Sequence, residues 1–114
     1  MFNLCKNIHH FSNIIDKCIE HTKQHNYLFI SYSIMDIKKI YTKILKDIRN
    51  SWFRLNNIQK NHIIYLIYGA ILHKVKKLQQ TISSFHKQST DIFDLLENVY
   101  LSFQSILPRL KLGL

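Results

Sequence analysis

A chain of 114 residues with only two cysteines is expected to form one domain around its own apolar core, without a disulfide framework. The 16 Lys and Arg side chains outnumber the 7 Asp and Glu side chains, and the formal net charge of +9 favours anionic partners such as nucleic acid, acidic proteins or an anionic membrane surface. Drift in an AT-rich genome also enriches Lys, Ile, Asn and Tyr, so the charge alone does not identify a partner.

The N-terminal stretch MFNLCKNIHHF lacks the uninterrupted apolar run and the small-residue cleavage site of a secretory signal. We therefore expect a cytoplasmic protein that keeps its whole chain. Cys5 and Cys18 fall in one predicted helix, about 20 Å apart, which is too far for a disulfide between them. A reducing compartment is the simpler expectation.

Two glycines and one proline leave few helix breakers, so long helices are expected. The first helix is predicted to end near residues 25–26. The side chains expected to face the core from it are Ile8, Phe11, Ile15, Cys18, Thr22 and His25.

The second helix is predicted to end near residues 53–57. Its expected core face consists of Ile34, Ile37, Tyr41, Ile44 and Ile48. Residues 26–34, NYLFISYSI, have the aromatic and β-branched content of a strand. A lone strand would lack a partner, because no second run of this kind occurs, so we expect these residues to open the second helix.

The third helix has the most regular spacing and is expected to be long. It is predicted to begin after Asn56 or Asn57, since either residue can cap it. Its expected core face consists of Ile64, Tyr68, Ile71, Val75, Leu78, Ile82 and Phe85. The apolar run over residues 63–72 is far shorter than the roughly 20 residues that span a bilayer, so we expect no membrane helix.

The fourth helix is predicted to begin at an N-cap, either Ser89 or Thr90. Asp91 and Asp94 follow in the first turn, where carboxylates interact favourably with the helix dipole. Pro108 is expected to end the helix. Its expected core face consists of Ile92, Leu95, Leu96, Val99, Phe103 and Ile106.

The predicted fold is all-α, an up-down antiparallel four-helix bundle with a long third helix and a short C-terminal tail. Short connections between successive helices favour antiparallel neighbours. The bundle domain is expected to cover residues 1–107, and residues 108–114 form the tail.

His21 and His25 are weak metal candidates, because an i, i+4 pair can share one ion. Cys18 lies on the same helix face, but it is about 10 Å from His25 along the axis, whereas zinc ligands lie about 2 Å from the metal. Cys5 and His9 form a second i, i+4 pair on nearly the opposite face. No HExxH or ExxH pattern supplies further ligands. We therefore expect no metal.

Sequence motifs of catalysis are missing from the chain. The patterns GxxxxGK[ST], GxGxxG and GxSxG do not occur, and two glycines cannot build a phosphate-binding loop. The spacing of Asp91, Asp94 and Glu97 is explained by helix capping and the helix dipole. We predict that the protein is not an enzyme and has no cofactor.

Two groups of apolar residues are candidates for binding a partner. The spacing of the third helix places Ile63, Leu66 and Ile67 beside its core face, where they either pack inside the monomer or form an exposed patch. Trp52 and Phe53, in the stretch NSWFRL with its two arginines, either pack at the bundle end or anchor an interface.

Basic residues form a candidate phosphate-binding surface on the second and third helices. The residues concerned are Lys38, Lys39, Lys43, Lys46, Arg49, Lys74, Lys76 and Lys77. Such a surface can follow a nucleic-acid backbone without sequence preference, although a solvated helix face explains the same spacing. No helix-turn-helix or aromatic RNA-binding pattern accompanies the charge.

In length and helix order the chain resembles small helical adaptor proteins, including flagellar and type III export chaperones. That resemblance implies a short, detachable fourth helix that covers a groove on the second and third helices until a partner displaces it. We therefore expect a non-enzymatic adaptor, chaperone or regulator that binds another protein, or a second copy of itself, through apolar helix surface. The alternative is a nucleic-acid-associated protein.

Overall fold

The computed structural model describes the backbone of residues 2–85 and 90–111, in which every regular element is helical. The elements in chain order are α1 (Phe2–Lys23), α2 (Tyr27–Ser51), the 3₁₀ helix η1 (Trp52–Arg54), α3 (Asn57–Leu66), the π-helix η2 (Ile67–Leu72), α4 (His73–Phe85) and α5 (Thr90–Lys111). The all-α prediction is confirmed, and α3, η2 and α4 together form the third of four helical segments.

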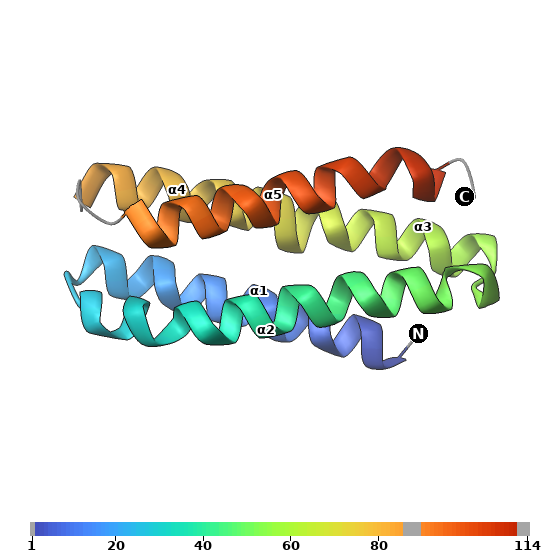
Figure 1. Ribbon diagram of the computed structural model, residues 1–114, viewed down its shortest axis with the longest axis horizontal. Helices are drawn as coiled ribbons and strands as arrows, with labels where there is room; N and C mark the ends of the chain where they lie inside the picture. Colours follow the sequence, from blue (N-terminus) through green and yellow to red (C-terminus); the bar gives the residue numbers. More distant parts are fainter. Residues whose placement is uncertain (1, 86–89, 112–114) are drawn as a thin grey trace.

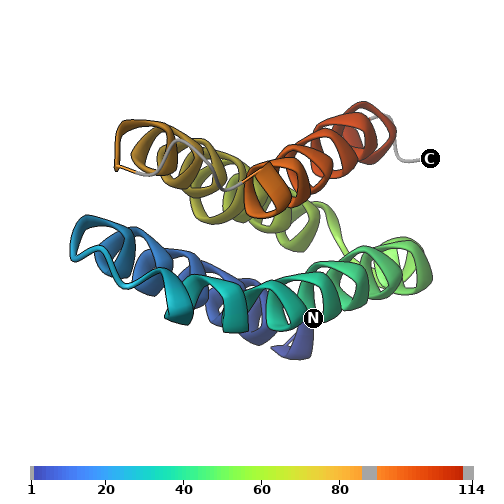
Figure 2. The same ribbon diagram turned by 60° about the vertical axis from the view of Figure 1, so that its left-hand side comes forward.

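The four segments pack as two layered hairpins, 43 Å long and 22 by 18 Å across. One layer contains α1 and α2, and the other contains α5 beside the third segment (Figures 1 and 2). Successive segments run in opposite directions along the long axis (Figure 1). None of the helices in the described residues combines the length and the apolarity that a membrane crossing requires.

The prediction that successive helices are neighbours is wrong for the second and third segments. In the described residues α1 packs against α2 and α4, whereas α5 packs against α4 and α2. The outer faces of α2 and α4 therefore lie on opposite corners of the bundle. The connection explains this arrangement, because Leu55 is buried and extended (φ −87°, ψ 141°) and carries the chain across the bundle end.

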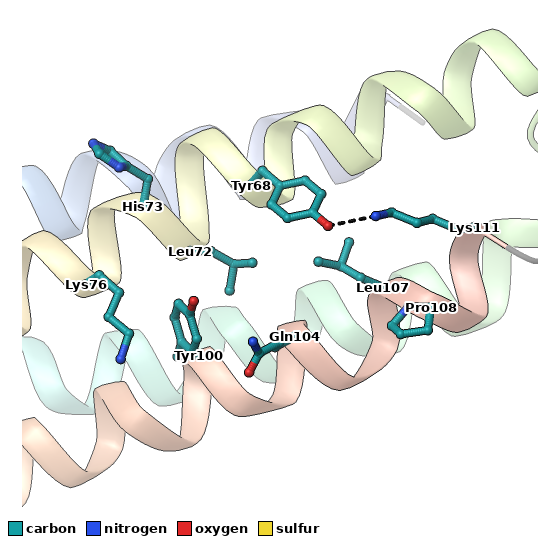
Figure 3. Close-up of a pocket in the computed structure, with 9 residues that line it drawn as sticks. All are labelled: Tyr68, Leu72, His73, Lys76, Tyr100, Gln104, Leu107, Pro108 and Lys111. Atoms are coloured by element: carbon teal, nitrogen blue, oxygen red, sulfur yellow. Dashed lines mark hydrogen bonds between the residues drawn. The ribbon is translucent and has the colours of Figure 1, made fainter.

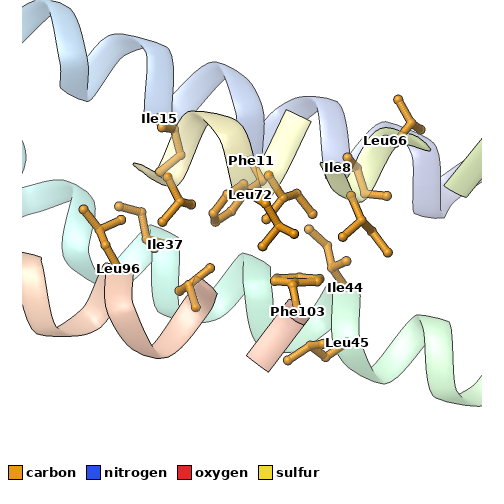
Figure 4. Close-up of a cluster of buried hydrophobic side chains, with 14 of the residues drawn as sticks. Ile8, Phe11, Ile15, Ile37, Ile44, Leu45, Leu66, Leu72, Leu96 and Phe103 are labelled. Atoms are coloured by element: carbon orange, nitrogen blue, oxygen red, sulfur yellow. The ribbon is translucent and has the colours of Figure 1, made fainter. Parts of the chain in front are cut away.

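Side chains from all four segments meet in one apolar core (Figure 4). The core faces predicted for the first and fourth helices are buried, apart from the exposed His25. Ile37, Ile44 and Ile48 of the second helix are buried as predicted, and Ile34 and Tyr41 are half-buried. Residues spaced by three and four in these helices therefore locate the core correctly.

Helix ends are set by local capping. His25 has a positive φ of 60°, and the next residue, Asn26, caps α2 by accepting a hydrogen bond at Oδ1 from the Phe29 backbone N–H at 3.4 Å. Residues 27–34 are helical, as predicted.

A capping box at Asn56 begins α3. Asn56 Oδ1 accepts a hydrogen bond from the Gln59 backbone N–H at 2.8 Å, and Gln59 Oε1 accepts one from the Asn56 backbone N–H at 3.0 Å. This confirms the predicted start of the third segment.

The core face predicted for the third segment is wrong before residue 71. Ile63 and Ile67 are fully buried, whereas Ile64 is half-buried and Tyr68 is 45% exposed. In an α-helix, side chains four residues apart differ by about 40° in direction around the axis. A series of residues spaced by four therefore turns gradually away from the core. The π-helix η2 has more residues per turn and keeps Ile63, Ile67 and Ile71 aligned.

Two further predictions about helix length are wrong. The third segment is not one notably long α-helix, because η2 separates the 10-residue α3 from the 13-residue α4. Pro108 does not end α5, which continues to Lys111 and buries Leu107 and Leu110. Residues 108–111 therefore belong to the bundle, and burial of two leucines explains why the last turn persists. The predicted N-cap Ser89 and residues 112–114 lie outside the described residues.

The π-helix buries Ile67 and exposes the adjacent Tyr68, so substitutions at the two residues should differ in their effect on the free energy of unfolding. Ile67→Ala should lower the free energy of unfolding by about 2–5 kcal/mol, because it opens a cavity in the core. Tyr68→Ala should lower it by less than about 1 kcal/mol, because this ring lies at the surface. Urea unfolding followed by far-ultraviolet circular dichroism measures both values, and the reverse ranking would show that the third segment keeps regular α-helical spacing.

Candidate functional site

Of the two alternatives for Ile63, Leu66 and Ile67, the structure shows packing inside the monomer and not an exposed patch. These side chains are at most 7% exposed, so they are not accessible to a partner as the predicted binding role would require. Of the residues predicted to bind a partner, Phe53 alone is exposed. The large apolar side chains that are exposed in the described residues are Leu28, Tyr32, Met35, Phe53, Ile58, Tyr65, Tyr68 and Leu101.

A groove of about 630 Å³ runs between the C-terminal parts of α2 and α5, and we call it the α2–α5 groove. Its apolar lining consists of Ile48, Trp52, Phe53, Ile106 and Leu110. Its polar lining consists of Arg49, Ser102, Ser105 and Arg109. The groove exists because small serines occupy the side of α5 that faces α2. The Ser105 hydroxyl donates a hydrogen bond to the Ser102 carbonyl oxygen of the same helix at 3.0 Å.

Trp52 and Phe53 occupy opposite environments although they are adjacent. Trp52 is 5% exposed and Phe53 is 73% exposed. They begin the tight helix η1, where each residue turns further around the axis than in an α-helix. The Arg54 guanidinium lies 5.2 Å from the centre of the Phe53 ring, and Lys60 Nζ lies 5.6 Å from that of Trp52. Trp52 therefore packs at the bundle end, whereas Phe53 is exposed and accessible to a partner.

The electrostatic character of the α2–α5 groove is positive. Arg49 comes from α2 and Arg109 from α5, and the lining contains no carboxylate. In the part of the chain that the structure describes, neither arginine forms an ion pair. The buried Nε1–H of Trp52 also has no acceptor within these residues. The groove thus offers unused donors beside apolar side chains, as a binding site for an anionic and partly apolar partner would.

A second groove of about 580 Å³, the α4–α5 groove, lies on the other side of α5 (Figure 3). Lys111 Nζ donates a hydrogen bond to the Tyr68 hydroxyl at 2.8 Å. Lys76 Nζ lies 4.4 Å from the centre of the Tyr100 ring and 3.8 Å from a Glu97 carboxylate oxygen. The lining residues are Tyr68, Leu72, His73, Lys76, Tyr100, Gln104, Leu107, Pro108 and Lys111.

The predicted phosphate-binding residues do not form one surface. Those of α2 are all exposed: Lys38, Lys39, Lys43, Lys46 and Arg49. Those of α4 lie on the diagonally opposite segment: Lys74, Lys76 and Lys77. Lys74 pairs with Asp16, and Lys76 with Glu97, which reduces the positive charge there. The exposed row on α2 is therefore the continuous basic surface.

The predicted metal candidates contact aromatic and amide groups at the turn between α1 and α2. The His21 ring stacks on Phe29 with 3.8 Å between ring centres, and its Nδ1 is 3.1 Å from the Asn26 side-chain nitrogen. His25 Nδ1 is 2.7 Å from the Tyr27 hydroxyl. Within residues 2–85 and 90–111, no three His, Cys, Asp or Glu side chains are grouped to hold a metal.

Comparison with known proteins gives no relative for this chain. No protein-family model matches it, and no curated protein and no solved structure matches it either. The function is therefore inferred from the two grooves and the surface charge.

The two cysteines should differ in reactivity. Burial raises the pKa of the Cys18 thiol, an effect that a hydrogen bond with the Ser33 side chain partly offsets, and partial burial also raises the pKa of Cys5. At neutral pH iodoacetamide should modify the half-buried Cys5 well before the fully buried Cys18, as mass spectrometry of timed samples would show. Equal rates at the two sites would contradict this burial.

The same pKa shifts predict a stability change in alkali. The folded state holds the thiol protons more tightly than the unfolded chain, so the contribution is fully present below the ordinary thiol pKa of about 8.5. It is lost as pH rises through the raised values. The fall in unfolding free energy above about pH 8.5 should be smaller in Cys18→Ala than in the unchanged protein. An identical fall would exclude a contribution from Cys18.

Proposed function

We propose that this protein is a non-enzymatic, cytoplasmic adaptor, chaperone or regulator that binds another protein through the α2–α5 groove. One observation carries the proposal: the 73% exposed Phe53 lies beside Arg49 and Arg109, neither of which has an ion pair in the described residues. Exposed aromatic rings and arginines beside an apolar wall are the residue types that dominate binding energy at protein interfaces.

The shape of the groove suits an amphipathic helix. α2 and α5 run in the same direction on either side of it (Figure 1), so a third helix can lie between them with its apolar face on Ile106 and Leu110. Acidic side chains at the edges of such a helix would meet the two arginines. A second copy of this protein can use the same surface, and a homodimer is the alternative occupant.

The resemblance to export chaperones supports a partner site near α5. α5 packs against both α2 and α4, as that resemblance implies for a fourth helix. α5 is a 22-residue helix with a continuous buried face, whereas the resemblance implies a short and detachable one. We therefore place the partner beside α5, in the groove, and not beneath it.

Binding through the groove predicts a selective loss in one variant. Tagged protein should capture a partner from an extract of its source cells, and the double variant Phe53→Ser, Arg109→Glu should lose at least about 2 kcal/mol, or about thirtyfold in Kd. The partner is identified by mass spectrometry, and the affinities are then measured with the purified pair. If the partner is a second copy, light scattering should show a dimer that the double variant abolishes.

Tyr65→Ser is the matched control, because Tyr65 is also 73% exposed but lies on α3, outside both grooves. The control should bind as the unchanged protein does, and circular dichroism should show equal helix content in all three proteins. Equal loss of binding in the control and the double variant would contradict the assignment to the groove.

A second function, binding of a nucleic-acid backbone, is favoured by the exposed row of Lys39, Lys43 and Lys46 on α2. Reversing these three charges to Glu should abolish binding to duplex DNA or RNA in fluorescence anisotropy at low salt. Reversal of Lys74 and Lys77 on the diagonally opposite α4 should leave binding nearly unchanged. Binding that survives reversal of the α2 row would rule this function out.

A further inference from the structure

The α4–α5 groove brings together an aromatic side chain and a lysine that lie far apart in the sequence. Tyr68 was expected in the core and is instead 45% exposed, because the π-helix η2 turns it toward α5. Single turns of π-helix are often found at functional sites. The result is a surface tyrosine within hydrogen-bond distance of Lys111, although the two residues are 43 positions apart in the chain (Figure 3).

The floor of this groove is apolar and its walls are aromatic. Leu72 and Leu107 are buried at its base, and Tyr68 and Tyr100 stand above them on opposite sides (Figure 3). A hydrated inorganic anion gains nothing from such a floor. A flat ring system would gain from both features, because aromatic rings stack on tyrosine and exclude water from the leucines.

The rim of the groove is cationic. Lys76 and Lys111 line it, and no carboxylate is among the lining residues. Lys76 is partly neutralised by Glu97, which in turn accepts a hydrogen bond from Gln79 at 2.9 Å. Lys111 has only the neutral Tyr68 hydroxyl as its hydrogen-bond partner in the described residues. An anion at this end would gain a stronger, charge-assisted hydrogen bond from Lys111.

We propose that the α4–α5 groove binds a nucleoside phosphate, with the base between Tyr68 and Tyr100 and the phosphate on Lys111. Gln104 lines the same groove and carries both a donor and an acceptor for the edge of the base. The volume of about 580 Å³ lies within the range of small-ligand sites. This site is on the other side of α5 from the α2–α5 groove, so it stands or falls independently of the proposed protein partner.

The test is a nuclear magnetic resonance titration of the labelled protein at low salt with AMP, adenosine and inorganic phosphate. AMP should shift the backbone amides of η2 and the C-terminal half of α5, with a Kd at least about tenfold below that of either fragment. Equal affinity for AMP and phosphate would show a charge site without base recognition and would overturn the proposal. So would the absence of shifts in the groove at millimolar AMP, or equal binding of a short polyglutamate peptide.

Two pairs of variants separate the proposed contacts from general effects of charge and exposure. Lys111→Ala and Tyr68→Ala should each weaken AMP binding by about tenfold or more, because one loses the phosphate contact and the other the stacking ring. Lys77→Ala is the control for the lysine, and Tyr65→Ala is the control for the tyrosine. Both control residues are exposed on the third segment but do not line the groove. Equal weakening in a variant and its control would overturn the assignment of that contact.

The same chemistry can come from a free nucleotide or from one unit of a single strand. Titration with a single-stranded oligonucleotide distinguishes these sources. Much tighter and steeply salt-dependent binding of the oligonucleotide would identify a single strand, because several phosphates then release counterions. Equal affinity per site would identify the free nucleotide. Both results support a nucleoside phosphate site, whereas failure of AMP and oligonucleotide alike to shift the groove amides would exclude it.

Discussion

The π-helical turn at Ile67–Leu72 is the constraint on which the surface of this protein depends. It keeps Ile63, Ile67 and Ile71 in the core, so the third segment can pack on α1 and α5 along its whole length. A regular α-helix would turn part of this series toward solvent. Gly69 lies in this turn, and a side chain there would meet no atom within 4 Å, so close packing does not explain the glycine. The main consequence of the turn at the surface is the position of Tyr68.

The path of the chain across the bundle end has a comparable effect on charge. Had the second and third segments been neighbours, the basic residues of α2 and α4 would have formed one broad positive surface. Because the buried, extended Leu55 leads the chain to the diagonal position, the row on α2 stands apart from the lysines of α4. On α4, Lys74 and Lys76 pair with carboxylates of α1 and α5. These two ion pairs lower the positive potential around α4, although the net charge of the chain remains +9.

Local rules predicted the elements well, and they failed where backbone geometry or chain path decided the outcome. The spacing of Ile8, Phe11 and Ile15, and the cap at Asn56, required only α-helical periodicity and capping chemistry, and the structure has both. The core face before Ile71 was misplaced, because no residue pattern revealed the π-helix. Phe53 was recognised from NSWFRL, but its groove could not be, since Ser102 and Arg109 come from a helix some 50 positions away whose neighbours depend on the fold.

The two grooves share a cause, which is the choice of residues on the two sides of α5. Toward α2 this helix presents Ser102 and Ser105, where leucines would fill the space beside Ile48 and Trp52 and stabilise the bundle. Toward α4 it presents Gln104 above buried leucines. Larger apolar side chains at these positions would add apolar contact, so the residues that occur there make the bundle less stable than it could be on both sides of α5. Both grooves contain cationic side chains beside apolar ones, and the proposed binding of anionic, partly apolar partners would account for the space and for the charge.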